Sequence, residues 1–315
     1  MLVLWAYAVA CNLVLVDNGA RLDIRDKRGR TALHWAAFSG NRDKLEFIAG
    51  RCTDASDLAK AACIGDLTQV KRLLEQGADV NEKDELCWTP LHWAASTGEK
   101  DVAEFLLAKG ANVDSKSKNG GIPLLRAAQS GHAEIVRILV ENGANINRKG
   151  GNYMATPIQY AALAGHKPVV EYLLAKGADI HEGDDRWGNT ALHYVAWNGN
   201  VDILEFLLDK GWDIEAKESN GKGGTPLGHA VNNNQIKSAQ LLLNRGANVN
   251  ARRNDGSTVL HGAARKGYEE MVELLLANGA DINAVTNEGH VPLWYAKEGG
   301  HTEIIRLLRK HGAKE

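Results

Sequence analysis

The histidines are the side chains with the clearest potential for metal or acid–base chemistry, and the chain has 11 of them. Seven occupy two recurring positions of a repeated pattern: His34, His92, His193 and His261 in one, and His132, His166 and His301 in the other. Equivalent positions of packed helices lie roughly 8–10 Å apart, whereas ligand bonds to zinc are about 2 Å long. One ion cannot bridge that gap, so we predict histidines hydrogen-bonded to helix caps and turns, with no metal and no cofactor.

Other groups give no stronger case for catalysis. Residues 220–225 (NGKGGT) superficially resemble a phosphate-binding loop, but they lack the Gly-Lys-Ser/Thr order and a preceding strand. A lengthened turn is the expected structure. Several acids are expected on solvated turns: Glu82, Asp84, Glu85, Asp184 and Asp185. No Ser-His-Asp or Cys-His pairing stands out from the repeated pattern, so the chain is predicted not to be an enzyme.

The elements that carry these residues are short helices. In residues 89–95 (TPLHWAA), Thr89 can cap a helix and the proline follows at a position where its missing N–H costs nothing. Gly98 can end that helix in the left-handed conformation, and apolar residues at helical spacing then continue to Gly110. Two helices of roughly ten residues are marginal alone, because nucleation is costly. They must pack against neighbours.

The same pattern recurs along almost the whole chain. Positions equivalent to Thr89 are Thr31, Ser56, Ile122, Thr156, Thr190, Thr225, Thr258 and Val291. From Ser56 onward the steps are 33, 33, 34, 34, 35, 33 and 33 residues, and the helix-ending glycines keep the same spacing. A fixed period of this length is typical of a repeat protein.

The motifs TPLH at 89–92, TALH at 31–34 and TALH at 190–193, with Gly-Ala-Asp/Asn endings at this period, resemble ankyrin repeats. The resemblance implies an all-α solenoid of about nine helix-turn-helix units plus a partial N-terminal one, with β-turn fingers along one edge. It also implies that fingers and first helices line a concave groove, and that second helices form the convex back.

Departures from the pattern suggest two domains. Few residues separate Cys52 from Ser56, so the finger expected there is missing, and polar residues after Ser56 resemble an opening cap. We therefore predict degenerate or truncated leading units in residues 1–54 and a main array with a C-terminal capping unit in residues 55–315. Whether the two stack continuously is left open, as is the existence of a longer parent protein.

Composition limits the partners and the compartment. The formal charge is −2, which gives no electrostatic case for binding nucleic acid or an anionic membrane. The cysteines show no metal-site spacing: Cys11, Cys52, Cys63 and Cys87. Free thiols favour a reducing, cytoplasmic location. The uncharged residues Met1–Val16 fit a second helix of a leading unit, although a secretion signal or membrane anchor stays open as an alternative.

The remaining candidates are residues that the packing pattern leaves free. Fingers and the ends of first helices are expected to expose leucine, aromatic and polar side chains: Leu86, Trp88, Tyr153, Arg186, Trp187, Trp197, Asn233 and Arg253. Aromatic residues with arginine nearby are typical of binding hot spots. In the alternative, these aromatics only pack finger against finger. Aromatics next to the histidine position are expected to be structural: Trp35, Trp93, Tyr160, Tyr194 and Tyr295.

The sequence therefore predicts a monomeric, non-catalytic scaffold that binds a protein partner in the groove. The alternative is the targeting arm of a larger enzyme or effector whose active domain lies upstream of Met1, a hypothesis motivated by a first unit without a polar cap. The identity of the partner does not follow from the fold.

Overall fold

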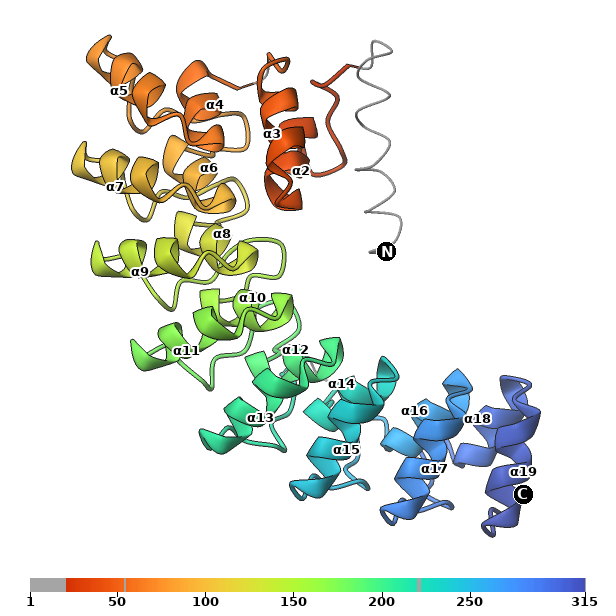
Figure 1. Ribbon diagram of the computed structural model, residues 1–315. Coiled ribbons are helices and arrows are strands. Elements are labelled where there is room, and N and C mark those ends of the chain that lie inside the picture. Colours follow the sequence, from red (N-terminus) through yellow and green to blue (C-terminus); the bar gives the residue numbers. More distant parts are fainter. Residues whose placement is uncertain (1–20, 54, 220–221, 315) are drawn as a thin grey trace. The chain divides into compact units, whose positions relative to one another are not determined.

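The computed structural model describes residues 21–53, 55–219 and 222–314 (Figure 1). These residues form 18 helices in nine consecutive pairs. An isolated antiparallel β-bridge joins Gly150 and Ala155. The predicted all-α repeat solenoid is confirmed. The partial unit predicted before Thr31, including Met1–Val16, lies outside the described residues. None of the described helices combines the length and apolar character needed to cross a membrane.

The chain divides into two compact units. The first, residues 1–178, contains α2 (Ala32–Ser39), α3 (Arg42–Ala49), α4 (Asp57–Ile64), α5 (Leu67–Glu75), α6 (Pro90–Thr97), α7 (Lys100–Ala108), α8 (Pro123–Ser130), α9 (Ala133–Glu141), α10 (Pro157–Ala164) and α11 (Lys167–Ala175). The second, residues 179–315, contains α12 (Ala191–Asn198), α13 (Val201–Asp209), α14 (Pro226–Asn232), α15 (Ile236–Asn244), α16 (Val259–Lys266), α17 (Glu269–Ala277), α18 (Pro292–Glu298) and α19 (Thr302–Lys310).

The helix starting at Pro90 shows why each first helix forms. Thr89 is extended at the N-cap, its hydroxyl accepts from the N3 backbone N–H, and the His92 side chain accepts from the Thr89 N–H. This reciprocal arrangement satisfies two donors that a helix start otherwise leaves unpaired. Gly98 ends the helix with φ of +86°, in the left-handed conformation that favours glycine. Both features were predicted from the sequence.

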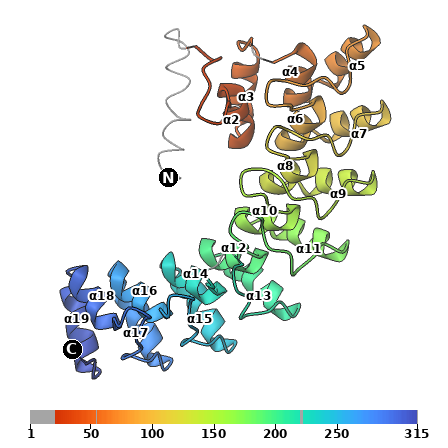
Figure 2. The same ribbon diagram turned by 180° about the vertical axis from the view of Figure 1, so that it is seen from behind.

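Within each unit, the first helices pack side by side and the second helices form an outer row. α4, α6, α8 and α10 make one row and α12, α14, α16 and α18 the other, as Figures 1 and 2 show from opposite sides. Paired alanines such as Ala94 and Ala95 are fully buried between neighbouring first helices. Their small size lets the helix axes approach closely. We call the side formed by fingers and first helices the first-helix face.

The leading pair, α2 and α3, leaves this stacking order. α2 packs against α6 and α3 packs against α4, on the side of α4 that faces away from α5. The link between α3 and α4, residues 50–56, is shorter than the link 76–89 between the next two pairs. Arg42 secures the contact, because it donates to the Ile64 carbonyl at 2.6 Å and to Glu99 at 3.0 Å. The predicted domain division at residue 54 stays a prediction.

A fully buried leucine of the second unit tests how much the repeat core contributes. Leu192 in α12 has no exposed surface, so Leu192→Ala should lower the free energy of unfolding by about 2–5 kcal/mol through lost transfer energy and a cavity. Val285→Ala, at a side chain 44% exposed, is the control and should change it by less than about 0.5 kcal/mol. Urea denaturation followed by circular dichroism measures both, and equal midpoints for Leu192→Ala and the parent would contradict the prediction.

Candidate partner-binding site

Three histidines of the first position, His92, His193 and His261, join successive repeats. In His92, Nδ1 accepts from the Thr89 N–H at 3.1 Å, so Nε2 carries the proton and donates to the Gly121 carbonyl of the next finger at 3.2 Å. His193 makes the equivalent bond to the Gly224 carbonyl at 3.3 Å. Each imidazole therefore ties its own helix cap to the following repeat.

The histidines of the second position make the reverse connection. The Nε2 atoms of His132, His166 and His301 donate to carbonyls of the preceding repeat, each at 3.1 Å. The ring of His132 lies over Gly98, where an added Cβ would stand 2.7 Å from Nδ1. The prediction of hydrogen-bonded histidines is confirmed, and the described ranges hold no group of three potential metal ligands.

Burial keeps two of these imidazoles neutral. Burial lowers the pKa of His92 to about 3. It also lowers the pKa of His193 to about 4, with a further contribution from the nearby charge of His229. Desolvation penalises the charged form of a buried group. Both residues are therefore structural linkers at neutral pH.

The structure corrects the prediction that Trp88 is free on the first-helix face. Its side chain is only 3% exposed. The ring lies 5.0 Å from His34 and 5.7 Å from Phe38, both on α2, and 4.7 Å from Trp93. Trp88 is buried because the displaced leading pair covers it, which the repeat pattern does not reveal.

The other two candidates of the first unit line a cavity next to Trp88. Leu86 and Tyr153 are half-buried and border a cavity of about 930 Å³ between α2 and the first-helix face. The Tyr153 ring lies 5.8 Å from Tyr160, and its backbone N–H donates to the Tyr160 hydroxyl at 3.1 Å. The structure thus brings Leu86 and Trp88 of one finger together with Tyr153 of another.

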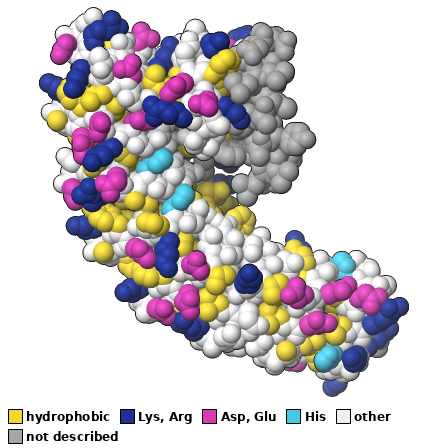
Figure 3. Space-filling model, viewed as in Figure 1, with side chains coloured by type: hydrophobic (Ala, Val, Ile, Leu, Met, Phe, Trp, Pro, Cys, Tyr) yellow, Lys and Arg dark blue, Asp and Glu magenta, His cyan; other side chains and the backbone are white. Residues whose placement is uncertain are grey.

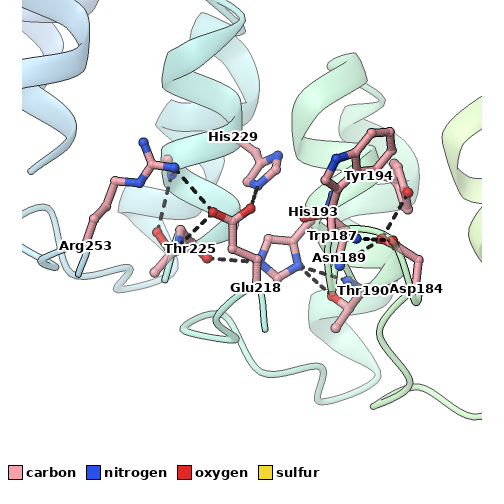
Figure 4. A network of polar contacts seen from close by, with 12 residues as sticks. Asp184, Trp187, Asn189, Thr190, His193, Tyr194, Glu218, Thr225, His229 and Arg253 are labelled. Carbon is pink, nitrogen blue, oxygen red and sulfur yellow. Dashed lines mark hydrogen bonds and ion pairs between the residues drawn. The ribbon is translucent and has the colours of Figure 1, made fainter. Parts of the chain in front are cut away.

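In the second unit, a buried carboxylate shapes the finger that presents Trp187 (Figure 4). Asp184 is 3% exposed, which corrects the prediction that it is solvated. It accepts N–H bonds from Arg186 at 2.9 Å, Trp187 at 2.6 Å and Asn189 at 2.8 Å, and a hydroxyl bond from Tyr194 at 3.1 Å.

Asp84 was also predicted to be solvated, and the structure corrects this too. It is buried in the equivalent finger of the first unit, where it accepts from the N–H groups of Leu86 and Trp88, both at 2.8 Å. A buried carboxylate is stable only when such donors surround it.

Three aromatic and cationic candidates remain accessible on the second unit. Trp197, on the last turn of α12, is 44% exposed. Trp187 is half-buried, and the exposed Arg186 places its guanidinium 4.5 Å from the Trp187 ring. An aromatic ring with an arginine stacked on it is a typical anchor of protein interfaces.

The last two candidates are partly engaged in internal bonds. Arg253 is half-buried and donates to Glu218 at 3.3 Å, while the Asn233 amide donates to the His229 carbonyl at 3.2 Å. Figure 4 shows Glu218 between Arg253 and His229, whose Nε2 lies 3.2 Å away. Burial by itself raises the pKa of Glu218, but His229, the Gly224 N–H and Arg253 outweigh it and lower the pKa to about 2. Partner binding by Arg253 and Asn233 stays a prediction.

Some residues that shape these surfaces were not singled out from the sequence. Glu218 and His229 form a pair across a finger and a helix, and nothing in their spacing marks it. Arg126 does carry a signal, because it replaces the aromatic residue next to the histidine position, held in the neighbouring repeats by Trp93 and Tyr160.

Comparisons with known proteins agree with this architecture. A family model described as "Ankyrin repeats (3 copies)" matches residues 58–150 and 227–315. A second, described as "Ankyrin repeats (many copies)", matches residues 158–208 and 200–243. Together the matched segments cover most of the chain. The crystal structure of the human ASB11 ankyrin repeat domain superposes with a TM-score of 0.64 at 31% identity, covering 72% of this chain and 99% of that one.

Curated relatives match over shorter segments. Protein VAPYRIN-LIKE of Medicago truncatula is 38% identical over 84 residues, which is 27% of this chain and 17% of that protein. Palmitoyltransferase AKR1 of Debaryomyces hansenii is 30% identical over 105 residues, 28% of this chain and 13% of that protein. The matched segments thus span less than a fifth of either relative.

The buried histidines predict how stability depends on pH. Folded pKa values of about 3 for His92 and about 4 for His193 lie below the ordinary 6.5. As pH falls below 6.5 the unfolded chain takes up protons that the folded chain refuses, so stability is lost on acidification. From pH 7 to pH 5 each histidine should cost up to about 2 kcal/mol.

A double His92→Gln/His193→Gln variant tests this expectation. Glutamine already occupies the equivalent position of another repeat, where the Gln159 side chain accepts from the Thr156 N–H at 2.7 Å. Urea midpoints at pH 7, 6 and 5 should fall less steeply for the variant than for the parent. Identical pH dependence of the two proteins would show that these imidazoles titrate normally when folded.

Proposed function

The chain belongs to the ankyrin repeat family, and from that premise we propose that it is a non-catalytic scaffold that binds a protein partner on its first-helix face. The observation that carries the proposal is the exposed aromatic and cationic surface of the second unit. Trp197 is 44% exposed. Arg186 stacks on the ring of Trp187, the next residue in the sequence. Ankyrin repeats are in general protein-interaction modules, so a surface of this composition is the expected place for contact.

The rigidity of the Trp187 finger supports this proposal. Four hydrogen bonds converge on the Asp184 carboxylate and hold the turn in one conformation. A side chain on a preformed turn loses less conformational freedom on binding, so more of the contact energy appears as affinity.

Charge supports a protein rather than a nucleic acid as partner. On the face that Figure 3 shows, lysine and arginine side chains alternate with aspartate and glutamate. The formal net charge of the chain is −2. A nucleic-acid site needs a basic stripe that neutralises several phosphates.

A double Trp187→Ala/Trp197→Ala variant tests this surface. Tagged protein is used to capture partners from a cell lysate, and recovered proteins are quantified by mass spectrometry. At least one partner should be recovered by the parent and lost about tenfold or more in the variant, the scale of removing hot-spot residues. Trp294→Ala, at another exposed tryptophan (38%), is the control and should retain that partner. Equal recovery of every protein by parent and double variant would count against the site.

A second candidate function is the recognition part of a longer enzyme or effector. It is supported by the match to palmitoyltransferase AKR1, in which the matched segment is 13% of the protein. An antibody against the repeat array should then detect an endogenous protein much larger than the 34.1 kDa of this chain. A single immunoblot band at 34.1 kDa would exclude this candidate.

A further inference from the structure

The cavity between the leading pair and the first-helix face has the size of a ligand site. Its volume of about 930 Å³ falls in the range of small-molecule pockets, roughly 300–1,000 Å³. Its walls come from α2, from α6, α8 and α10, and from the fingers between them. The lining includes five aromatic rings: Trp35, Phe38, Trp88, Tyr153 and Tyr160.

One buried cation in this lining, Arg126, has no carboxylate partner among the described residues. Arg126 on α8 is only 7% exposed and makes one hydrogen bond, from an Nη atom to Gln129 at a long 3.4 Å. Its Nε has no hydrogen-bond partner among the described residues. The guanidinium lies 4.6 Å from the Trp88 ring and 5.5 Å from the Phe38 ring. Burial lowers the pKa of Arg126 to about 10, so it is still charged at neutral pH.

A buried charge without a counter-ion is costly, and the ring contacts compensate for only part of that cost. At the equivalent position the two neighbouring repeats hold aromatic side chains, Trp93 and Tyr160, while Lys60 and Gly262 stand there in two other repeats. Neighbouring helices can therefore pack around this position without a cation. The presence of arginine needs a further explanation.

The charges around the cavity are unbalanced in the same direction. Four further cations border it: Arg28, Arg30, Arg42 and Lys118. Of these, Arg30 is already paired with Asp26 at 2.6 Å. Glu99 is the carboxylate among the lining residues, and it is already paired with Arg42 at 3.0 Å. The cavity thus combines aromatic walls with an excess of positive charge.

We propose that this cavity binds a small organic carboxylate, whose anionic group pairs with Arg126 and whose apolar body lies against the aromatic walls. The planar guanidinium offers paired N–H donors that match a carboxylate. A small molecule fits better than a peptide, because α2 covers this part of the first-helix face and leaves a cavity of ligand size. The lining of this site includes neither Trp187 nor Trp197.

Titration of the full chain with matched acids and amides tests the site. The probes are phenylacetate and hexanoate, each compared with its uncharged amide, and the side-chain Nε–H NMR signal of Arg126 and tryptophan fluorescence report binding. In the parent, at least one acid should bind about tenfold or more tightly than its amide, the scale of a charge-assisted hydrogen bond. Arg126→Gln should abolish that preference, and Arg126→Lys should retain part of it.

Arg137→Gln is the matched control, because Arg137 belongs to the same repeat but pairs with Glu134 at the surface. It should preserve the preference for the acid. The comparison in the parent protein is decisive even if a variant at Arg126 fails to fold: no preference for either acid would overturn the proposal. Persistence of the preference in Arg126→Gln would also overturn it. A capped Phe-Glu-Phe peptide serves as a further probe. If only this peptide, and neither small acid, showed the acid preference, the proposal would also be overturned.

Discussion

The packing of each helix pair against its neighbour, reinforced in several repeats by an imidazole link, is the interaction on which this structure depends. A pair of helices of seven to nine residues cannot bury enough apolar surface to be stable alone. Each pair must therefore hold its neighbour at close distance and in one register. His92 does this by accepting from its own helix cap and donating to the Gly121 carbonyl of the next finger, while His132 reaches back to the carbonyl of Ser96. Stability is consequently distributed over units and interfaces.

Once the stack is fixed, departures from the repeated pattern are where specific properties arise. Glu218 and His229 form a hydrogen-bonded pair between a finger and a helix, and Arg126 places a cation where neighbouring repeats have an aromatic ring. Trp197 leaves a large apolar surface exposed at the end of a first helix. These side chains give the first-helix face its chemistry.

The two units present this face differently. In the first, the leading pair covers Trp88 and leaves a cationic, aromatic cavity beneath α2. In the second, the finger anchored by Asp184 presents Trp187 and Arg186 at an open surface. A partner protein can reach the open surface directly, whereas the cavity suits a ligand of limited size. One repeat framework thus provides two kinds of recognition surface.

The sequence by itself determined the repeat length, the helix pairs, the caps and the hydrogen-bonded role of the histidines. These features are local, or they recur at a fixed period, so each repeat supplies the same evidence again. Only the tertiary structure decided what is exposed. Trp88 is buried because α2 leaves the stacking order and packs against α6, a contact between residues far apart in the sequence. Asp184 is buried because its own finger folds back on it, which the residue type does not reveal. Exposure depends on how each finger folds and on which elements pack over it, so the position of the binding surface could not follow from periodicity alone.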